Sequence, residues 1–180
     1  SWAMLRLASR PEIIEELYEE QVRVYSDGAG GFAPLDYDTQ KSSVPVLDAV
    51  IRETLRMHPP IHSLMRRVKS DMVVPPTLAA PKTGKGQSTD TYVIPKGHYL
   101  VAAPGVSQID PHVWCDADKF DPHRWLGDKT LIDQTDDAQE DFGWGLVSTG
   151  ANSAYLPFGA GRHRCIGEQF AYLQLGTIIS

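Results

Sequence analysis

The ten residues from Phe158 to Gly167, FGAGRHRCIG, constrain the fold of this chain more than any other stretch. They place Cys165 among three glycines, two arginines and one histidine, directly before a stretch with helical periodicity. Unpaired backbone N–H groups at the start of a helix favour an anion, and neighbouring cations favour a thiolate over a thiol. Glycines let the backbone approach a ligand closely. The loop therefore favours a thiolate at Cys165.

Such a thiolate can be a nucleophile, a redox sensor or a metal ligand. A cysteine protease also needs a general-base histidine and an orienting Asn or Asp, and nothing beyond His163 completes that set. A zinc site needs further Cys or His ligands at short spacing. A single thiolate beside cations that can bind carboxylates favours haem iron. A thiol redox protein that uses Cys165 and Cys115 remains an alternative.

The rest of the chain has the pattern of a mainly helical protein with short strands. One strand is expected at residues 67–74 and a β-hairpin within TYVIPKGHYLVAA, and residues 32–42 favour a loop. The last helix is apolar on nearly every side, which is typical of a buried helix. These elements predict a mainly α, α+β architecture. Apolar periodicity predicts helices at residues 1–8, 11–25, 44–57 and 166–179.

Charge and composition limit the classes of partner that this chain could bind. The 180 residues carry a formal charge of -6 without a stripe of Lys or Arg, which argues against nucleic acid. No apolar stretch reaches the length of a membrane span. The chain does not start with Met, and both of its ends resemble helix interiors. We therefore expect a piece of a longer protein.

The cysteine loop resembles the haem-binding signature of the cytochrome P450 superfamily, Phe-x-x-Gly-x-(Arg/His)-x-Cys-x-Gly. Its fixed positions are filled in register. The resemblance implies a partial cytochrome P450 domain over residues 1–180, which lacks the upstream part and the C-terminal end of the family's fold. The residues that fill the signature are Phe158, Gly161, His163, Cys165 and Gly167.

Two further motifs precede the loop in the family's order. Glu53 and Arg56 share a helix face, and by themselves they indicate only a surface ion pair. They resemble the family's Glu-x-x-Arg motif, and FDPHRW resembles its Pro-x-x-Phe-x-x-(Arg)-Trp stretch, although Asp118 stands where many members have Pro. The resemblance implies that Arg124 joins Glu53 and Arg56 in a buried structural network.

The resemblance also implies the cofactor and its contacts. The cofactor would be haem b, iron protoporphyrin IX, with Cys165 as the axial ligand of its iron. Arg66 and His163 would bind the propionates. The family's oxygen-handling residues would lie upstream of Ser1, so no other catalytic residue is expected here. The expected cofactor-binding residues are Arg66, Phe158, Gly159, His163, Cys165, Ile166 and Gly167.

The stretch HPPIHSLMRRV, together with the cysteine loop, is similar to sterol 14α-demethylases, especially the fungal ones. This similarity implies oxidative removal of the 14α-methyl group by repeated oxygen insertion. His62 is more typical of a structural histidine than of an acid–base catalyst. The residues expected to border the sterol pocket are Ile61, His62, Ser63, Leu64 and Met65.

The implied partners follow from the same similarity. They are a sterol, molecular oxygen and an NADPH-dependent reductase, at the cytoplasmic face of the endoplasmic reticulum membrane. The membrane would be reached through a segment outside these residues. Two alternatives remain open: a monooxygenase that acts on another lipid or a foreign compound, and a non-catalytic haem-binding fragment.

Overall fold

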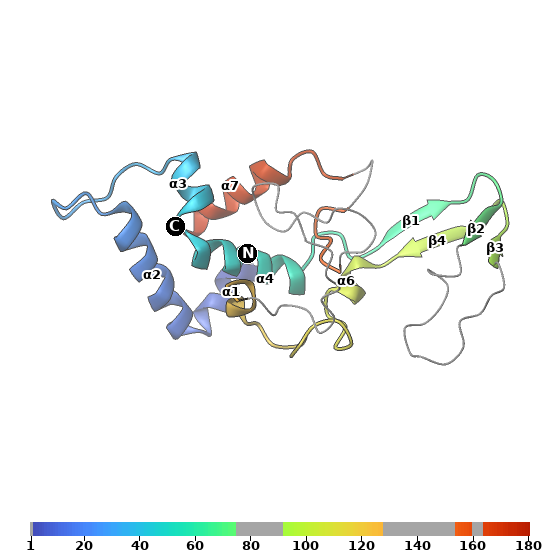
Figure 1. Cartoon of the computed structure of the whole chain (residues 1–180), viewed down its shortest axis with the longest axis horizontal. Helices are drawn as coiled ribbons and strands as arrows, with labels where there is room; N and C mark the ends of the chain where they lie inside the picture. Colours follow the sequence, from blue (N-terminus) through green and yellow to red (C-terminus); the bar gives the residue numbers. More distant parts are fainter. Residues whose placement is uncertain (1, 75–91, 128–153, 160–163) are drawn as a thin grey trace. The chain divides into compact units, whose positions relative to one another are not determined.

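The computed structural model describes residues 2–74, 92–127, 154–159 and 164–180. The chain divides into two compact units, each with its own architecture. Residues 1–62 with 104–180 form a helical unit, and residues 63–103 form a strand unit (Figure 1). Helices with two small sheets confirm the predicted mixed, mainly helical fold class.

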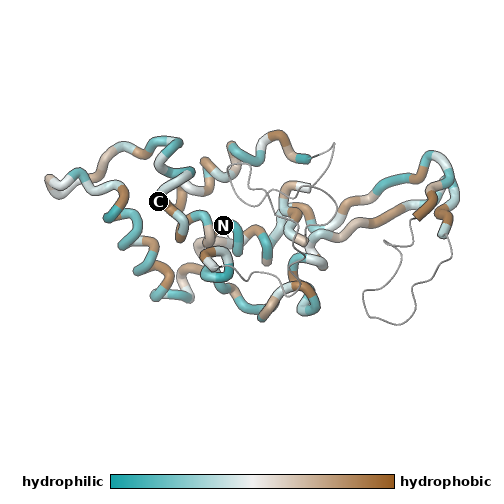
Figure 2. The backbone as a smooth tube through the Cα atoms, in the orientation of Figure 1, coloured by the Kyte–Doolittle hydropathy of each residue, from teal (hydrophilic) through white to brown (hydrophobic). Residues whose placement is uncertain are grey.

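The helical unit is organised around α4 (Pro45–Met57), which packs most extensively against four other elements. Pro45 suits the first turn of a helix because its missing N–H has no partner there anyway. Hydrophobic and hydrophilic residues alternate along α2 (Figure 2), and its buried face includes Ile13 and Leu17. The neighbours of α4 are α1 (Trp2–Ala8), α2 (Pro11–Tyr25), the 3₁₀ helix η1 (Pro122–Trp125) and α7 (Glu168–Ile179). A four-residue helix, α6 (Pro104–Ser107), also lies in this unit.

The core of this unit lies against the apolar face of α4. Leu47, Val50 and Ile51 are almost completely buried, together with Trp114 and Tyr172 from later segments. Glu20 of α2 is also buried, and its carboxylate accepts hydrogen bonds from the N–H groups of Val46 and Leu47. These N–H groups belong to the first turn of α4 and have no partner within the helix. A carboxylate on α2 therefore caps α4.

Two expectations for this unit were wrong. Residues 37–42 form a short helix, α3 (Tyr37–Ser42), where a loop was expected, because the Asp36 side chain accepts a hydrogen bond from Thr39 N–H and caps it. The last helix, α7, is not buried on nearly every side. Only Tyr172 and Gly176 are buried in it, since α7 packs one side against α4 and α3 and leaves Phe170 and Ile178 exposed.

The described residues of the strand unit form two antiparallel two-stranded sheets. Strand β1 (Leu64–Arg67) pairs with β4 (Tyr99–Ala102), and β2 (Met72–Val74) pairs with β3 (Tyr92–Ile94). The predicted hairpin was therefore wrong, because β3 and β4 do not pair with each other. The turn at residues 95–98 instead bonds across to Val68, which donates to His98 O and accepts from Gly97 N–H. Strands β3 and β4 therefore pair with β2 and β1 of the preceding segment and not with each other.

Candidate functional site

Cys165 lies three residues before α7, and its side chain is exposed. Its N–H donates to Phe158 O at 2.9 Å, which folds the loop back on itself. Gly159 N–H donates to Leu156 O at 3.2 Å, and Gly159 has φ of 74°, a value that glycine adopts without steric cost. The backbone conformation at this position therefore favours glycine at residue 159. Gly161 and His163 lie outside the described residues.

The surface around Cys165 combines one charged pair with exposed apolar groups. Arg164 donates to both carboxylate oxygens of Glu168, with Nε–Oε2 at 2.6 Å and Nη2–Oε1 at 2.7 Å. Ile166 is fully exposed, and Phe170 is 66% exposed. An accessible sulfur beside exposed apolar side chains fits a flat apolar cofactor whose metal Cys165 would hold. Among the described residues, no group of three or more His, Cys, Asp or Glu is placed to hold a free metal ion.

Buried aromatic residues support the loop from behind. The Phe158 ring lies 5.5 Å from the Tyr172 ring, centroid to centroid. The Tyr172 and Tyr155 hydroxyls are 3.1 Å apart, and the Tyr155 ring lies 4.8 Å from that of Trp125. Burial raises the pKa of Tyr155 and Tyr172 well above the usual value, so both hydroxyls stay neutral. The cysteine loop is thus packed against a neutral, hydrogen-bonded aromatic core.

The structure brings Glu53, Arg56 and Arg124 together in one buried cluster. Glu53 and Arg56 are both 0% exposed, and Arg56 Nε and Nη2 donate to the two oxygens of Glu53 at 2.9 and 2.8 Å. Arg124 Nε donates to Glu53 Oε1 at 3.0 Å. The remaining Arg56 hydrogen bonds go to the carbonyls of Gln108, Ala117 and Lys119. The two arginines therefore tie α4 to the segment that leads into η1.

Sequence reasoning missed two members of this cluster. Trp125 Nε1 donates to Glu53 Oε2 at 3.0 Å, and Asp121 N–H donates to Glu53 Oε1 at 3.0 Å. Trp125 belongs to the FDPHRW stretch, so the motif already included this residue. The motif did not predict its hydrogen bond to Glu53. A backbone N–H such as that of Asp121 carries no residue-specific signal.

The predicted substrate segment is divided between the two units. Ile61 and His62 end the first part of the helical unit, where His62 O accepts from Gly105 N–H at 3.1 Å. The imidazole of His62 packs so closely on Gly105 that a Cβ at this glycine would overlap it. Gly105 therefore packs directly against the His62 ring, at a position where a side chain would clash with it.

The other members of that segment lie in the strand unit. Ser63 precedes β1, and Leu64, Met65 and Arg66 lie on β1. Met65 and Arg66 are exposed, and Arg66 Nη1 donates to the carbonyl of Met65 at 3.0 Å. The Arg66 guanidinium therefore keeps most of its donors available for an anion.

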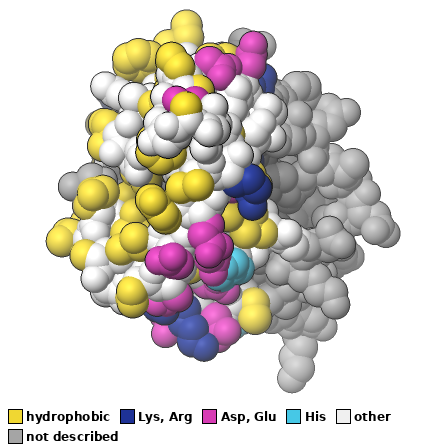
Figure 3. Space-filling model, turned by 90° about the vertical axis from the view of Figure 1, so that its left-hand side faces the viewer, with side chains coloured by type: hydrophobic (Ala, Val, Ile, Leu, Met, Phe, Trp, Pro, Cys, Tyr) yellow, Lys and Arg dark blue, Asp and Glu magenta, His cyan; other side chains and the backbone are white. Residues whose placement is uncertain are grey.

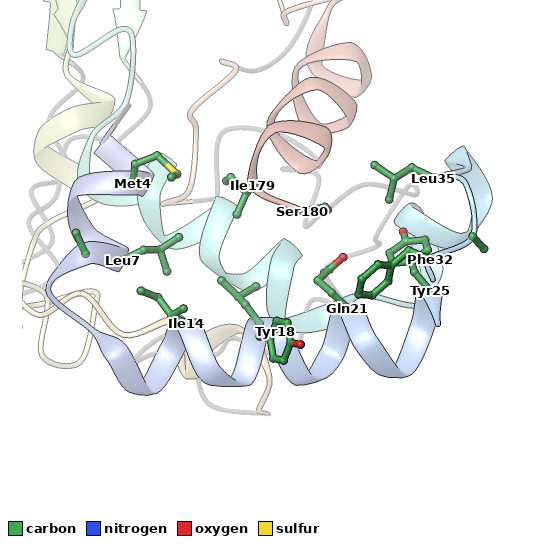
Figure 4. Close-up of a pocket in the computed structure, with 13 residues that line it drawn as sticks. Met4, Leu7, Ile14, Tyr18, Gln21, Tyr25, Phe32, Leu35, Ile179 and Ser180 are labelled. Atoms are coloured by element: carbon green, nitrogen blue, oxygen red, sulfur yellow. The ribbon is translucent and has the colours of Figure 1, made fainter. Parts of the chain in front are cut away.

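A separate apolar cavity of about 650 Å³ opens in the helical unit. The close-up in Figure 4 shows Leu7, Ile14 and Ile179 pointing into it from α1, α2 and α7. Hydrophobic side chains are also frequent on the face seen in Figure 3. Among the described residues, none that the sequence assigns to cofactor or substrate lines this cavity. Within the described part of the chain, no helix has the length and apolar character that crossing a membrane requires.

Comparison with known proteins adds independent evidence. A lanosterol 14-alpha demethylase of Mycosarcoma maydis is 67% identical over 182 aligned residues, which cover 100% of this chain and 32% of that protein. An eburicol 14-alpha-demethylase of Uncinula necator is 50% identical over 182 residues, again 100% of this chain and 32% of that protein. A lanosterol 14-alpha demethylase of Eremothecium gossypii is 48% identical, with 100% of this chain and 31% of that protein covered.

The chain thus spans about a third of the length of the curated relatives it matches. The sequence model of the family described as Cytochrome P450 matches residues 1–180. That match runs through the accessible cysteine, the loop folded back on Phe158 and the buried Glu53 cluster. On this sequence and this geometry, the chain belongs to the cytochrome P450 family.

Proposed function

We propose that this chain is part of a haem-thiolate monooxygenase that removes the 14α-methyl group of a sterol such as lanosterol or eburicol. The observation that carries the proposal is the 67% identity, over the whole chain, to a lanosterol 14-alpha demethylase. The aligned region covers the whole chain and therefore includes both the cysteine loop and the substrate segment. The proposal therefore concerns the reaction of the complete protein, of which these residues form one part.

Cytochrome P450 proteins bind haem through a cysteine thiolate. In this proposal the cofactor is haem b, which supplies the redox chemistry for splitting dioxygen and inserting one oxygen atom into a methyl C–H bond. Cys165 would hold the iron and donate charge to it. Gly159 and Gly167 would allow the backbone near the sulfur to approach the cofactor, while Phe158 and Ile166 would contact its apolar surface.

Arg66 and His163 bind the two propionates by charge-assisted hydrogen bonds. The exposed guanidinium of Arg66 supports this role. Arg67 provides a matched control, because it is the next residue of β1 and points to the opposite face of the strand. Arg66→Leu should lose haem about tenfold faster than wild type to an apoprotein acceptor, whereas Arg67→Leu should not. Equal rates of haem loss from the two variants would show that Arg66 does not bind the cofactor.

Ile61, His62, Ser63, Leu64 and Met65 border the sterol in this proposal. Met65 and Met72 are both exposed methionines of the strand unit, and only Met65 lies in the substrate segment. Because a pocket contact of this size is worth about 1–3 kcal/mol, Met65→Ala should raise KM for lanosterol about tenfold and leave haem content unchanged. Met72→Ala should change neither quantity. A Met65→Ala enzyme with wild-type KM would exclude this segment from the pocket.

Electrons would reach the haem from an NADPH-dependent reductase, and the protein would act at the cytoplasmic face of the endoplasmic reticulum membrane. The test of the whole proposal is turnover of lanosterol by the complete protein with NADPH and a fungal reductase, measured by mass spectrometry. The expected product lacks the 14α-methyl group, and lauric acid stays unchanged. Hydroxylation of lauric acid alone would assign the enzyme to another lipid. Bound haem without turnover of either compound would indicate a non-catalytic protein.

A further inference from the structure

Gln108 is a fully buried polar residue outside the sequence motifs. It follows α6, and its side-chain amide donates to Leu55 O at 3.0 Å and to Arg56 O at 2.9 Å. Both carbonyls belong to the last turn of α4, where a helix has no partners of its own for them. Its main-chain carbonyl accepts from Arg56 Nη1 at 2.8 Å. Gln108 is thus bonded to the end of α4 and to the Glu53 cluster at once.

The oxygen of the same amide faces the cysteine loop. Gln108 Oε1 accepts from Leu156 N–H at 2.8 Å. Leu156 O then accepts from Gly159 N–H, and Phe158 O accepts from Cys165 N–H. The short segment from Leu156 to Gly159 is therefore held by Gln108 at its start and itself holds Cys165 at its end.

The amide is the side chain that this place requires. It offers two N–H donors to two carbonyls and an acceptor to one N–H, and all three interactions are made. An apolar residue of the same length would satisfy none of them, and a buried unpaired N–H or C=O is costly. A carboxylate would keep only the acceptor.

We propose that Gln108 is a positioning residue that sets the entry of the cysteine loop relative to α4 and so holds Cys165 in its ligating orientation. This inference rests on the proposed haem-thiolate function. It assigns to Gln108 no contact with the haem or the substrate. Its effect reaches the sulfur through the backbone of Leu156, Phe158 and Cys165.

Three variants of the complete protein test the proposal. Gln108→Met removes all three side-chain hydrogen bonds, and Gln108→Glu keeps the acceptor for Leu156. Gln40→Met is the matched control, because Gln40 is also buried in the helical unit and its amide donates to Leu173 O, away from the cysteine loop. The first readout is hydrogen exchange by mass spectrometry over the peptide that carries Leu156. The second is the fraction of reduced haem that gives the red-shifted band of a thiolate-ligated CO complex.

We expect exchange at Leu156 about 10- to 100-fold faster in Gln108→Met, which is the range for loss of one buried hydrogen bond. The thiolate-ligated fraction should fall at least about tenfold relative to the other haem forms. Gln108→Glu should keep protection at Leu156 and most of the thiolate-ligated fraction, and Gln40→Met should match wild type in both. This pattern separates the orientation of the loop from loss of stability in general.

Three outcomes would overturn the proposal. The first is a folded Gln108→Met protein with wild-type exchange and a wild-type thiolate fraction. The second is an equal effect of Gln40→Met. The third is failure of both Gln108 variants to fold while Gln40→Met folds, because Gln108 would then serve the fold alone. Absence of the thiolate band from wild-type protein would reject the proposed function. The exchange rates would still test whether Gln108 holds Leu156 N–H, because they do not depend on haem ligation.

Discussion

Replacement of Glu53 by glutamine should destabilise the protein far more than an ordinary loss of one charge. The Glu53 carboxylate accepts five hydrogen bonds, from Arg56 Nε, Arg56 Nη2, Arg124 Nε, Trp125 Nε1 and Asp121 N–H. An amide in its place keeps one acceptor oxygen and turns an NH₂ group toward these donors. Two buried guanidinium groups then lose their counter-charge.

The magnitude follows from the burial of both partners. Breaking a buried ion pair by removing one partner costs about 3–5 kcal/mol, because the other charge stays buried and uncompensated. A typical domain is stable by only about 5–15 kcal/mol. Glu53→Gln should therefore remove about a fifth of the stability or more, and haem retention should fall with it.

The assay is urea unfolding of the complete protein, followed by tryptophan fluorescence, with Asp116→Asn as the matched control. Asp116 also pairs with a cation, Lys119, at 3.1 Å, but both side chains are about 60% exposed. An exposed pair of this kind is worth less than about 1 kcal/mol. Asn also tolerates the positive φ of Asp116. Equal unfolding midpoints for the two variants would refute the account of Glu53 as a shared buried counter-charge.

Two further predictions concern packing and pH. Gly176→Ala should destabilise the protein by about 1–3 kcal/mol in the same urea assay, because a Cβ there overlaps the buried amide of Gln40; an unchanged midpoint would mean that α3 and α7 do not pack this closely. The Glu16 carboxylate accepts a hydrogen bond from His123 at 2.7 Å and raises the pKa of that imidazole in the folded state. This contribution is complete below the unfolded pKa of about 6.5 and is lost as pH rises through the higher folded pKa. The stability difference between wild type and Glu16→Gln should therefore shrink from about pH 6 to pH 8, and a constant difference would contradict the pair.

The sequence predicted the local elements well where periodicity was strong. Helices expected at residues 11–25 and 44–57 were found at Pro11–Tyr25 and Pro45–Met57. Apolar spacing suffices there because each helix turns one face to the core. The helix at Tyr37–Ser42 escaped prediction, since it is short and is fixed mainly by the cap at Asp36.

Pairing and burial were harder to predict, because they depend on distant residues. The hairpin was wrong because β3 and β4 each find a partner in the preceding segment, and no local pattern tells which partner prevails. The exposure of α7 was missed for the same reason. Its apolar composition is compatible with burial, but the buried fraction of the helix depends on the elements that pack against it.

The candidate site shows the same division. Cys165 could be singled out from the chemistry of its own loop, and the joining of Glu53 to Arg124 followed from a resemblance. Gln108 and Glu20 could not be found, since a glutamine or glutamate gives no sign of the backbone group it will meet. Their partners, Leu156 N–H and Val46 N–H, are identical in kind to every other amide.

The most direct test of Cys165 as the iron ligand is the absorption spectrum of the complete protein, reduced under CO, for wild type and Cys165→Ser, with Cys115→Ser as the control. Both cysteines are free and exposed, so the two substitutions are chemically matched. Ligation of the iron by Cys165 predicts a red-shifted thiolate–CO band in wild type and Cys115→Ser and none in Cys165→Ser. Persistence of the band in Cys165→Ser, or its loss in Cys115→Ser alone, would show that the iron is held elsewhere.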